Sequence, residues 1–229
     1  HSPYSTPDRY FDLYPLSSIT LPDAPPEHLE NMLPVATRNI VYEYQRQRKC
    51  LQGYYASIIF IDAQLSLILD ALDRNDLWKT TLVLFVSDHG YNTGHHGTWH
   101  KETLFEQSAR VPLIVVPPRN DHAGAVCPRV VEMLDFYPAF AQYCGLPVPE
   151  QLEGKSFVPL LEDPQQPWDH TARTLVLRKT RDRKHSVLGH SIRTERYRYT
   201  EWDYGEKGIE LYDHNNDPHE FVNLALDRD

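Results

Sequence analysis

Residues 81–101 combine the pattern of a buried strand with side chains that could bind a cation and an anion. The first six of them, TLVLFV, are almost all apolar and rich in β-branched types, which is typical of a strand buried on both faces. Asp88 and His89 follow directly, at the end of a strand where ligands bind in open α/β sheets. They could offer an oxygen and a nitrogen to one cation. Lys101, later in the same loop, could bring a positive charge back to that place.

Each of these residues also has an ordinary structural interpretation. An Asp-His-Gly sequence is common outside functional sites, a loop lysine is usually solvated, and His95, His96 and His100 could be surface histidines. The whole arrangement favours a site. A buried strand, a Gly/His-rich loop, a tryptophan two residues before Lys101 and a second apolar run over residues 111–116 occur in succession.

A long helix is predicted to precede this strand. In residues 40–74 apolar side chains recur at three- and four-residue spacing, which marks one face of a helix, and Asn75-Asp76 would end it. A helix that leads into the strand forms a right-handed α/β unit. Residues 1–34 contain seven prolines without helical or strand periodicity, so they are predicted to be irregular.

The second half of the chain changes character after a turn-rich linker at residues 163–167. Residues 174–177 and 191–202 alternate aromatic or β-branched residues with charged ones, which is typical of half-exposed antiparallel strands. We therefore predict an α/β fold. Residues 1–165 would form a domain with a central sheet and flanking helices, and residues 166–229 a small antiparallel subdomain. Shorter elements are expected over residues 102–107 (helix), 111–116 (buried strand), 130–131 (strand), 135–143 (helix) and 210–213 (strand).

The composition limits the kinds of partner. The 229 residues carry 32 acidic and 23 basic side chains, a net charge of −9, which argues against a general nucleic-acid binder. The negative net charge is compatible with an anionic substrate, because a local cluster of positive charge can dominate the electrostatic field inside a cleft. No apolar run approaches the roughly 20 residues that cross a bilayer, so no membrane span is expected. Three cysteines are too few for a disulfide framework.

The motifs resemble those of the type I sulfatases of the alkaline phosphatase superfamily, and among them the iduronate-2-sulfatase-like group. The family pattern S-D-H-G-x-x-x-G-x-H-G-x-W-x-K matches residues 87–101, and the V-P-L-I segment that follows it matches residues 111–114. His1-Ser2-Pro3-Tyr4 matches the second half of the family's K-P-H-x-P-[FY] motif. Residues 210–224 match its E-L-Y-D-x-x-x-D-P-x-E-x-x-N-L signature.

This resemblance implies a sulfuric ester hydrolase whose substrate is a sulfated small molecule or sugar, for instance from a glycosaminoglycan. Asp88 and His89 would bind a divalent cation, and Ca²⁺ is the family's usual ion. Lys101 would bind a sulfate oxygen, and His1 would contact the ester and assist the departure of its leaving oxygen. The resemblance also favours an extracytoplasmic location, periplasmic, secreted or lysosomal.

Further substrate contacts are expected from the loop and from the small subdomain. The loop residues expected at the mouth of the site are Tyr91, Asn92, His95, Thr98, His100 and Glu102. Those expected to reach it from the subdomain are Arg178, His185 and His190.

Part of the family's machinery is missing from the sequence. The family's nucleophile is a formylglycine made from the Cys or Ser of a C/S-x-P-x-R motif, and none of Cys50, Cys127 and Cys144 stands in one. The paired aspartate ligands of the family's N-terminal half are missing too. The chain therefore resembles the C-terminal half of a sulfatase, and its expected partner is the N-terminal half of the same precursor.

Two alternatives stay open. A two-metal phosphodiesterase or phosphatase of the same superfamily would bind Zn²⁺ through Asp-His pairs, with His95 and His96 as extra ligands, because imidazole suits zinc. A catalytically dead relative that binds carbohydrate is the second. Choline sulfate and aryl sulfates also stay open as substrates.

Overall fold

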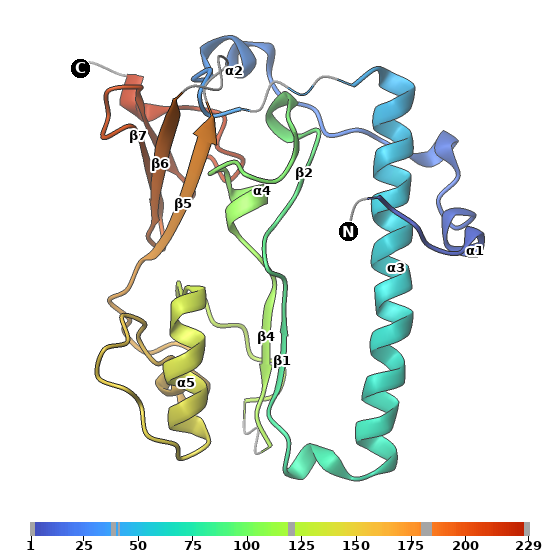
Figure 1. Cartoon of the computed structure of the whole chain (residues 1–229), viewed down its shortest axis with the longest axis vertical. Coiled ribbons are helices and arrows are strands. Elements are labelled where there is room, and N and C mark those ends of the chain that lie inside the picture. Colours follow the sequence, from blue (N-terminus) through green and yellow to red (C-terminus); the bar gives the residue numbers. More distant parts are fainter. Residues whose placement is uncertain (1–2, 38–39, 41, 119–121, 180–184, 227–229) are drawn as a thin grey trace. The chain divides into compact units, whose positions relative to one another are not determined.

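The computed structural model describes residues 3–37, 40, 42–118, 122–179 and 185–226 (Figure 1). The chain packs as two compact units. The first comprises His1–Thr103 and Gln107–Arg119, and the second Leu104–Glu106 and Asn120–Asp229. The boundary predicted between residues 165 and 166 falls inside the second unit and stays a prediction.

The longest element of the first unit is helix α3, Tyr44–Arg74, which confirms the helix predicted from apolar periodicity. Its last residue is Arg74 and Asn75 caps its C-terminus, where the end of the helix was predicted. The proline-rich segment before it contains only short helices: α1 (Asp8–Phe11), η1 (Leu16–Ser18) and α2 (Pro26–Asn31). A proline stands immediately before each of them. Proline suits a helix start because the N–H group it lacks would have no partner within the helix there.

Strands β1 (Val83–Val86) and β4 (Leu113–Val116) form a two-stranded antiparallel sheet, and the short helix η2 (Leu77–Lys79) links α3 to β1. The two predicted strands are therefore confirmed. The prediction that they are buried on both faces is wrong for the described chain. Phe85 is 37% exposed and Ile114 is 55% exposed, because among the described residues each strand pairs only with the other and further layers are lacking.

The loop after β1 forms a second small ladder. Strand β2 (Asn92–Thr93) pairs with β3 (Trp99–His100), and η3 (His95–Gly97) lies between them. The helix predicted over residues 102–107 begins later, as α4 (Glu106–Ala109). Glu102 has a φ of +70°, and this left-handed backbone cannot form part of a right-handed helix.

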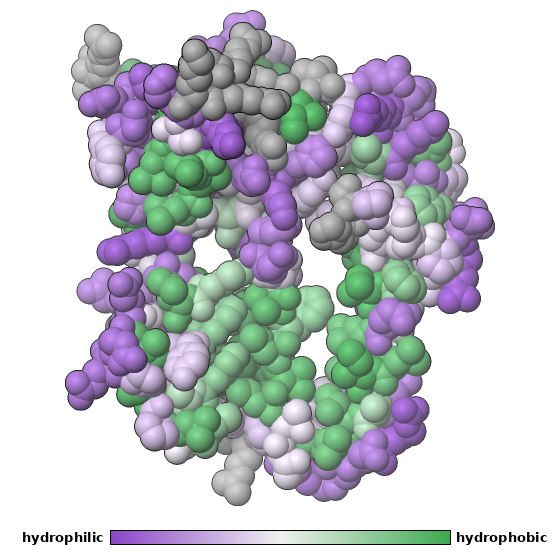
Figure 2. Space-filling view, viewed as in Figure 1, coloured by the Kyte–Doolittle hydropathy of each residue, from purple (hydrophilic) through white to green (hydrophobic). Residues whose placement is uncertain are grey.

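Apolar side chains of the first unit stay uncovered on α3 and on the β1–β4 pair. Figure 2 shows hydrophobic residues gathered over β1 and β4 and over the C-terminal half of α3. The exposed ones are Ile58, Ile61, Leu67, Ile68, Phe85 and Ile114. By length and composition alone, α3 could cross a membrane, which corrects the expectation that no segment of the chain meets that criterion. The core helices of soluble proteins meet it as well.

The second unit is built on a four-stranded antiparallel sheet in the order β5-β6-β7-β8. The strands are β5 (Ala172–Lys179), β6 (Ser186–Arg193), β7 (Tyr197–Trp202) and β8 (Ile209–Asp213). The alternating patterns are thus confirmed as strands. The run predicted over residues 191–202 is divided by a tight turn, where the Thr194 backbone N–H donates to the Tyr197 carbonyl oxygen at 2.8 Å and the Thr194 hydroxyl oxygen accepts from the Tyr197 N–H.

Short helices complete this unit: η4 (Met133–Asp135), α5 (Phe136–Tyr143), α6 (Val158–Glu162) and η5 (Leu224–Leu226). Helix α5 confirms the one predicted there, and Gly145 follows its end with a φ of +67°, a left-handed conformation that glycine adopts without strain. Residues 130–131 form no strand, contrary to prediction. The Val130 carbonyl oxygen instead accepts a hydrogen bond from Trp168 Nε1 at 2.9 Å.

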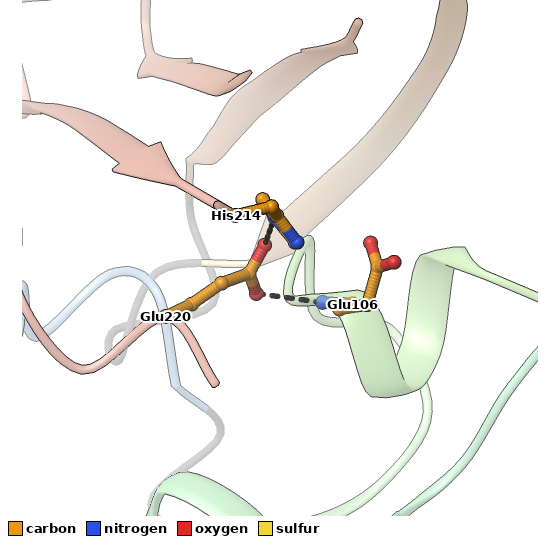
Figure 3. A group of neighbouring side chains, drawn as sticks. All are labelled: Glu106, His214 and Glu220. Atoms are coloured by element: carbon orange, nitrogen blue, oxygen red, sulfur yellow. Dashed lines mark hydrogen bonds and ion pairs between the residues drawn. The ribbon is translucent and has the colours of Figure 1, made fainter. Parts of the chain in front are cut away.

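A buried carboxylate holds the end of the second unit together. Glu220 is completely buried and pairs with Arg198. Figure 3 shows His214 and the backbone nitrogen of Glu106 directed at the Glu220 carboxylate. His214 Nε2 lies 2.9 Å from one carboxylate oxygen, and the Glu106 N–H donates to the other at 2.7 Å. Burial raises the pKa of Glu220, but the hydrogen bond from His214 and the charge of Arg198 outweigh burial and hold the pKa below its usual 4.5.

The lowered pKa of Glu220 predicts acid sensitivity. A carboxylate whose pKa is lower in the folded than in the unfolded state stabilises the fold above the unfolded pKa, and this stabilisation is lost as the pH falls through the folded pKa. Glu220→Gln should therefore lower the free energy of unfolding at pH 7 by about 3 kcal/mol, because it leaves buried partners uncompensated. Below pH 4.5 the free energy of unfolding should also decrease less steeply with falling pH in this variant than in the wild type. Urea unfolding at several pH values measures both effects, and Glu206→Gln, at an exposed position, is the control. Equal pH dependence in both variants would contradict the prediction.

Candidate active site

The loop that carries the candidate residues is anchored at Gly90. Its N–H donates to the Ser108 carbonyl oxygen at 2.9 Å, and a Cβ atom at this position would lie 2.0 Å from the Gln107 carbonyl oxygen. Only glycine allows this close approach of the two backbones. The residues immediately before Gly90 are therefore held against the segment that leads into β4.

Asp88, His89 and Lys101 lie together at the end of β1. Lys101 Nζ lies 2.8 Å from His89 Nε2, and Asp88 Oδ2 lies 3.4 Å from the same nitrogen. His89 Nδ1 lies 2.8 Å from the Gly90 carbonyl oxygen. Because a carbonyl oxygen only accepts, Nδ1 carries the proton, and the Nε2 lone pair accepts from the Lys101 ammonium group. The Asp88 carboxylate lies beside the same nitrogen.

This arrangement fits a divalent cation. Metal-binding histidines usually donate their second ring N–H to a carbonyl or carboxylate oxygen, which fixes the tautomer, and His89 does so through Gly90. The side chain of Asp88 is 84% exposed, so its oxygens are accessible to an ion. These two side chains fall short of the six to eight oxygen ligands that Ca²⁺ takes, so other groups must complete the coordination.

The other predicted substrate residues of the loop have different surroundings. Tyr91 is half-buried, with its hydroxyl 2.8 Å from His100 Nδ1. His95 is half-buried, with Nδ1 3.5 Å from the Thr93 hydroxyl, and Glu102 is exposed. His1 lies outside the described residues.

Two residues expected at the mouth of the site are instead completely buried. Asn92 and Thr98 have no exposed surface. The Asn92 amide donates to the Thr103 hydroxyl at 2.9 Å and to the Ser108 hydroxyl at 2.7 Å, so it holds the loop together. The expectation that Asn92 and Thr98 contact substrate is therefore wrong.

The residues expected to reach the site from the subdomain belong to the second unit. The Arg178 guanidinium lies 5.3 Å from the centre of the Trp202 ring. His190 Nδ1 lies 3.9 Å from Glu201 Oε1, and His185 is exposed. Their contact with substrate stays a prediction.

His96, a proposed zinc ligand in the two-metal alternative, has a structural role. It is only 1% exposed, with Nδ1 2.9 Å from His28 Nε2 and Nε2 2.9 Å from Gln107 Oε1. Both ring nitrogens face protein partners, and the ring is enclosed by the protein in this structure. The contact with His28, which comes from α2, was not predicted from sequence.

Two groups of acidic and histidine residues in the second unit have the spacing of metal ligands: Glu106, His214 and Glu220, and Glu132, Asp135 and His170. Their oxygens already accept hydrogen bonds. Besides the contacts of Glu220, the fully buried Asp135 accepts from the backbone N–H groups of Lys155 and Glu132 and from His170 Nε2, at 2.7, 2.8 and 2.9 Å. Both groups act as stabilising networks.

Sequence reasoning missed the aromatic residues around Tyr91. Tyr54 of α3 stacks on it with ring centres 5.6 Å apart, and Tyr4 meets both rings edge to face at 6.1 and 6.4 Å. Burial raises the pKa of Tyr4 and of Tyr54, so both phenols stay neutral. Tyr42, just before α3, hydrogen-bonds His100. Tyr54 belongs to residues 40–74, where apolar spacing predicted the helix, and it also begins a stretch, residues 54–62, that resembles a family motif.

Comparison with known proteins agrees with these motifs. The sulfatase family model matches residues 1–146, and the model for the C-terminal part of N-sulphoglucosamine sulphohydrolase matches residues 94–229. A sulfatase of Formosa agariphila is 32% identical over 98% of this chain and 44% of its own length. Human iduronate 2-sulfatase is 31% identical over 88% of this chain and 50% of its own length.

Solved structures share the fold. BT4656, in complex with its substrate D-glucosamine-2-N,6-O-disulfate, matches 78% of this chain and 37% of its own, with a TM-score of 0.71 and 25% identity. The phosphonate monoester hydrolase of Agrobacterium radiobacter matches all of this chain and 51% of its own, with a TM-score of 0.78 and 25% identity. The predicted fold class is thus confirmed, and the chain spans about half the length of the relatives it matches. Since the sulfatase model matches more than half of its residues, the chain belongs to the sulfatase family.

Proposed function

We propose that this chain is the C-terminal portion of a sulfatase that hydrolyses the sulfate monoester of a sugar. The observation that carries the proposal is the convergence of Asp88, His89 and Lys101, with Asp88 Oδ2 and Lys101 Nζ both within 3.4 Å of His89 Nε2. The names of human iduronate 2-sulfatase and of the disulfated glucosamine bound to BT4656 favour a sulfated sugar. The family resemblance also favours an extracytoplasmic location.

A sulfate monoester resists hydrolysis because its anionic oxygens repel a nucleophile, so the site must neutralise their charge. In the proposed mechanism Lys101 Nζ binds one sulfate oxygen as a point charge. Asp88 and His89 would hold the divalent cation, with the Nε2 lone pair bonding the ion in place of Lys101, and the ion would supply further electrophilic stabilisation of the sulfate. The hydrogen bond to Gly90 keeps the His89 ring oriented.

The remaining parts of the mechanism come from the family resemblance. The nucleophile is a formylglycine upstream of this chain, and His1 assists the leaving oxygen. Ca²⁺ is the proposed cation.

A phosphonate or phosphate ester hydrolase is the second candidate, favoured by the similarity to the phosphonate monoester hydrolase of Agrobacterium radiobacter. The zinc-dependent form of this alternative is less favoured, because its proposed ligand His96 is buried with its two nitrogens facing His28 and Gln107. The metal content of the purified complete enzyme, together with its relative turnover of aryl sulfates and phosphonates, distinguishes the two candidates. A relative that only binds carbohydrate would turn over neither substrate.

The N-terminal half of the same precursor is the proposed partner of this chain. Two points support it. The proposed cation site has Asp88 and His89 as its candidate ligands among the described residues, fewer than Ca²⁺ takes. Helix α3 and the β1–β4 pair expose apolar side chains such as Ile61 and Ile114. Exposed apolar faces of this kind mark interaction surfaces. A partner that packs on these faces would also supply the nucleophile.

Replacing Lys101 tests the sulfate-binding role. In the complete enzyme, Lys101→Ala should lower kcat/KM for an aryl sulfate by about 10²-fold or more, because one electrostatic contact to the transition state is lost. Lys79→Ala, which removes an exposed lysine that pairs with Asp76, should leave the rate unchanged. Near-normal turnover of Lys101→Ala would refute the assignment.

Calorimetry tests the cation site independently of turnover. Asp88→Asn in the complete enzyme should weaken Ca²⁺ binding at least about tenfold, because a neutral amide replaces a charged oxygen ligand. The matched control is Asp76→Asn, which changes an exposed aspartate remote from the site in sequence. Wild-type Ca²⁺ affinity in Asp88→Asn would remove Asp88 from the site.

Residues 1–229 alone should show no sulfatase activity and should bind the N-terminal half of the precursor. The assay uses an aryl sulfate with Ca²⁺, first on the purified chain and then after addition of the N-terminal half. Ile61→Glu and Ile114→Glu should weaken the association, because each places a charge on an apolar face. Leu13→Glu changes an exposed apolar residue outside these faces and is the control. Turnover by the soluble chain alone would show that its nucleophile lies within these residues.

A further inference from the structure

Lys101 stands in an unusual stretch of backbone. The residues on either side of it, His100 and Glu102, have φ angles of +74° and +70°. Residues other than glycine rarely adopt this left-handed region, and such strained positions persist only where the surrounding structure holds them. Something must therefore fix the turn that presents Lys101.

The His100 ring is held on both sides by phenol groups. Nε2 lies 2.7 Å from the Tyr42 hydroxyl, and Nδ1 lies 2.8 Å from the Tyr91 hydroxyl. A neutral imidazole has one donor and one acceptor, so one phenol accepts a hydrogen bond from the ring and the other donates to it. Both rings also meet the imidazole edge to face, with centres 5.9 and 5.7 Å away. This pair of contacts leaves the ring little freedom to rotate.

Both phenols are in turn fixed near helix α3. The Arg46 guanidinium lies 4.3 Å from the centre of the Tyr42 ring, and the buried Trp99 ring lies 5.6 Å from it. Tyr91 stacks on Tyr54 with an interplanar angle of 21°. The imidazole is thus connected on each side to the first half of the longest helix in the chain.

The backbone of His100 is held as well. Its carbonyl oxygen accepts a hydrogen bond from the Asn92 amide at 3.1 Å, and Asn92 is paired with His100 in the β2–β3 ladder. The same buried amide donates to Thr103 and Ser108, beyond the turn. Side-chain and backbone contacts therefore converge on the residue that directly precedes Lys101.

From these contacts we infer that His100, clamped between Tyr42 and Tyr91, is a positioning residue that holds the strained turn and aims the Lys101 ammonium group at the sulfate. The inference rests on the proposed function, because it assigns His100 a role only through Lys101. His100 needs no contact with the substrate in this arrangement. Its two phenol partners set the direction of Lys101 before the sulfate binds, which makes the site preorganised.

The test removes one phenol oxygen at a time from the complete enzyme. Tyr42→Phe and Tyr91→Phe keep the rings but lose a hydrogen bond to His100, so each should lower kcat/KM for an aryl sulfate roughly tenfold. The inhibition constant of inorganic sulfate should rise by a similar factor. Ca²⁺ affinity should stay at the wild-type value. Tyr55→Phe, at a half-buried tyrosine whose ring contacts Tyr14, should behave as wild type.

The decisive comparison repeats both substitutions in a Lys101→Ala background. If the phenols act through Lys101, neither should lower the rate further, because the group they position is gone. An equal tenfold loss in that background would overturn the inference, and so would wild-type kinetics of both single variants. If Lys101→Ala itself turns over normally, the proposed function fails as well, and the two failures are thereby distinguished.

Discussion

The hydrogen bond between His89 Nδ1 and the Gly90 carbonyl oxygen is the contact on which the candidate site depends. It gives the ring one tautomer and leaves the Nε2 lone pair facing Lys101, with the Asp88 carboxylate beside it. The backbone at Gly90 also lies against the Gln107 carbonyl, where no Cβ atom fits. A single glycine thus connects the end of β1 to the segment before β4 and fixes the site between them.

A second constraint is the apolar surface of the first unit. Helix α3 is long and apolar enough to cross a membrane, yet it carries Asp62 and Asp70, which are costly inside a bilayer. Burial against protein suits such a helix better, because charged residues can stay at the solvent-exposed side. Burial against another part of the protein also explains why β1 and β4, whose sequences are typical of buried strands, have exposed faces here. In our proposal the missing layers belong to the N-terminal half of the precursor.

Local patterns predicted the elements well, and long-range contacts account for what they missed. Apolar spacing located α3, β1 and β4 because the periodicity of a helix or a strand is visible in residues close together in the sequence. Apolar spacing did not predict the turn within residues 191–202, which the Thr194 side chain stabilises. It also placed the start of α4 too early, because it did not predict the left-handed backbone of Glu102. Asp88, His89 and Lys101 were predicted from motif and spacing, and they do lie together. The contacts of His100 with Tyr42 and of His96 with His28 join residues 58 and 68 positions apart, which no local pattern records.

The most direct test of the account is a crystal structure of the complete enzyme with Ca²⁺ and inorganic sulfate. We expect one ion bonded to an Asp88 carboxylate oxygen and to His89 Nε2. We also expect the Lys101 ammonium group within hydrogen-bond distance of a sulfate oxygen. An ion bound elsewhere, or a sulfate that Lys101 does not contact, would contradict the central claim that these three residues form the sulfate site.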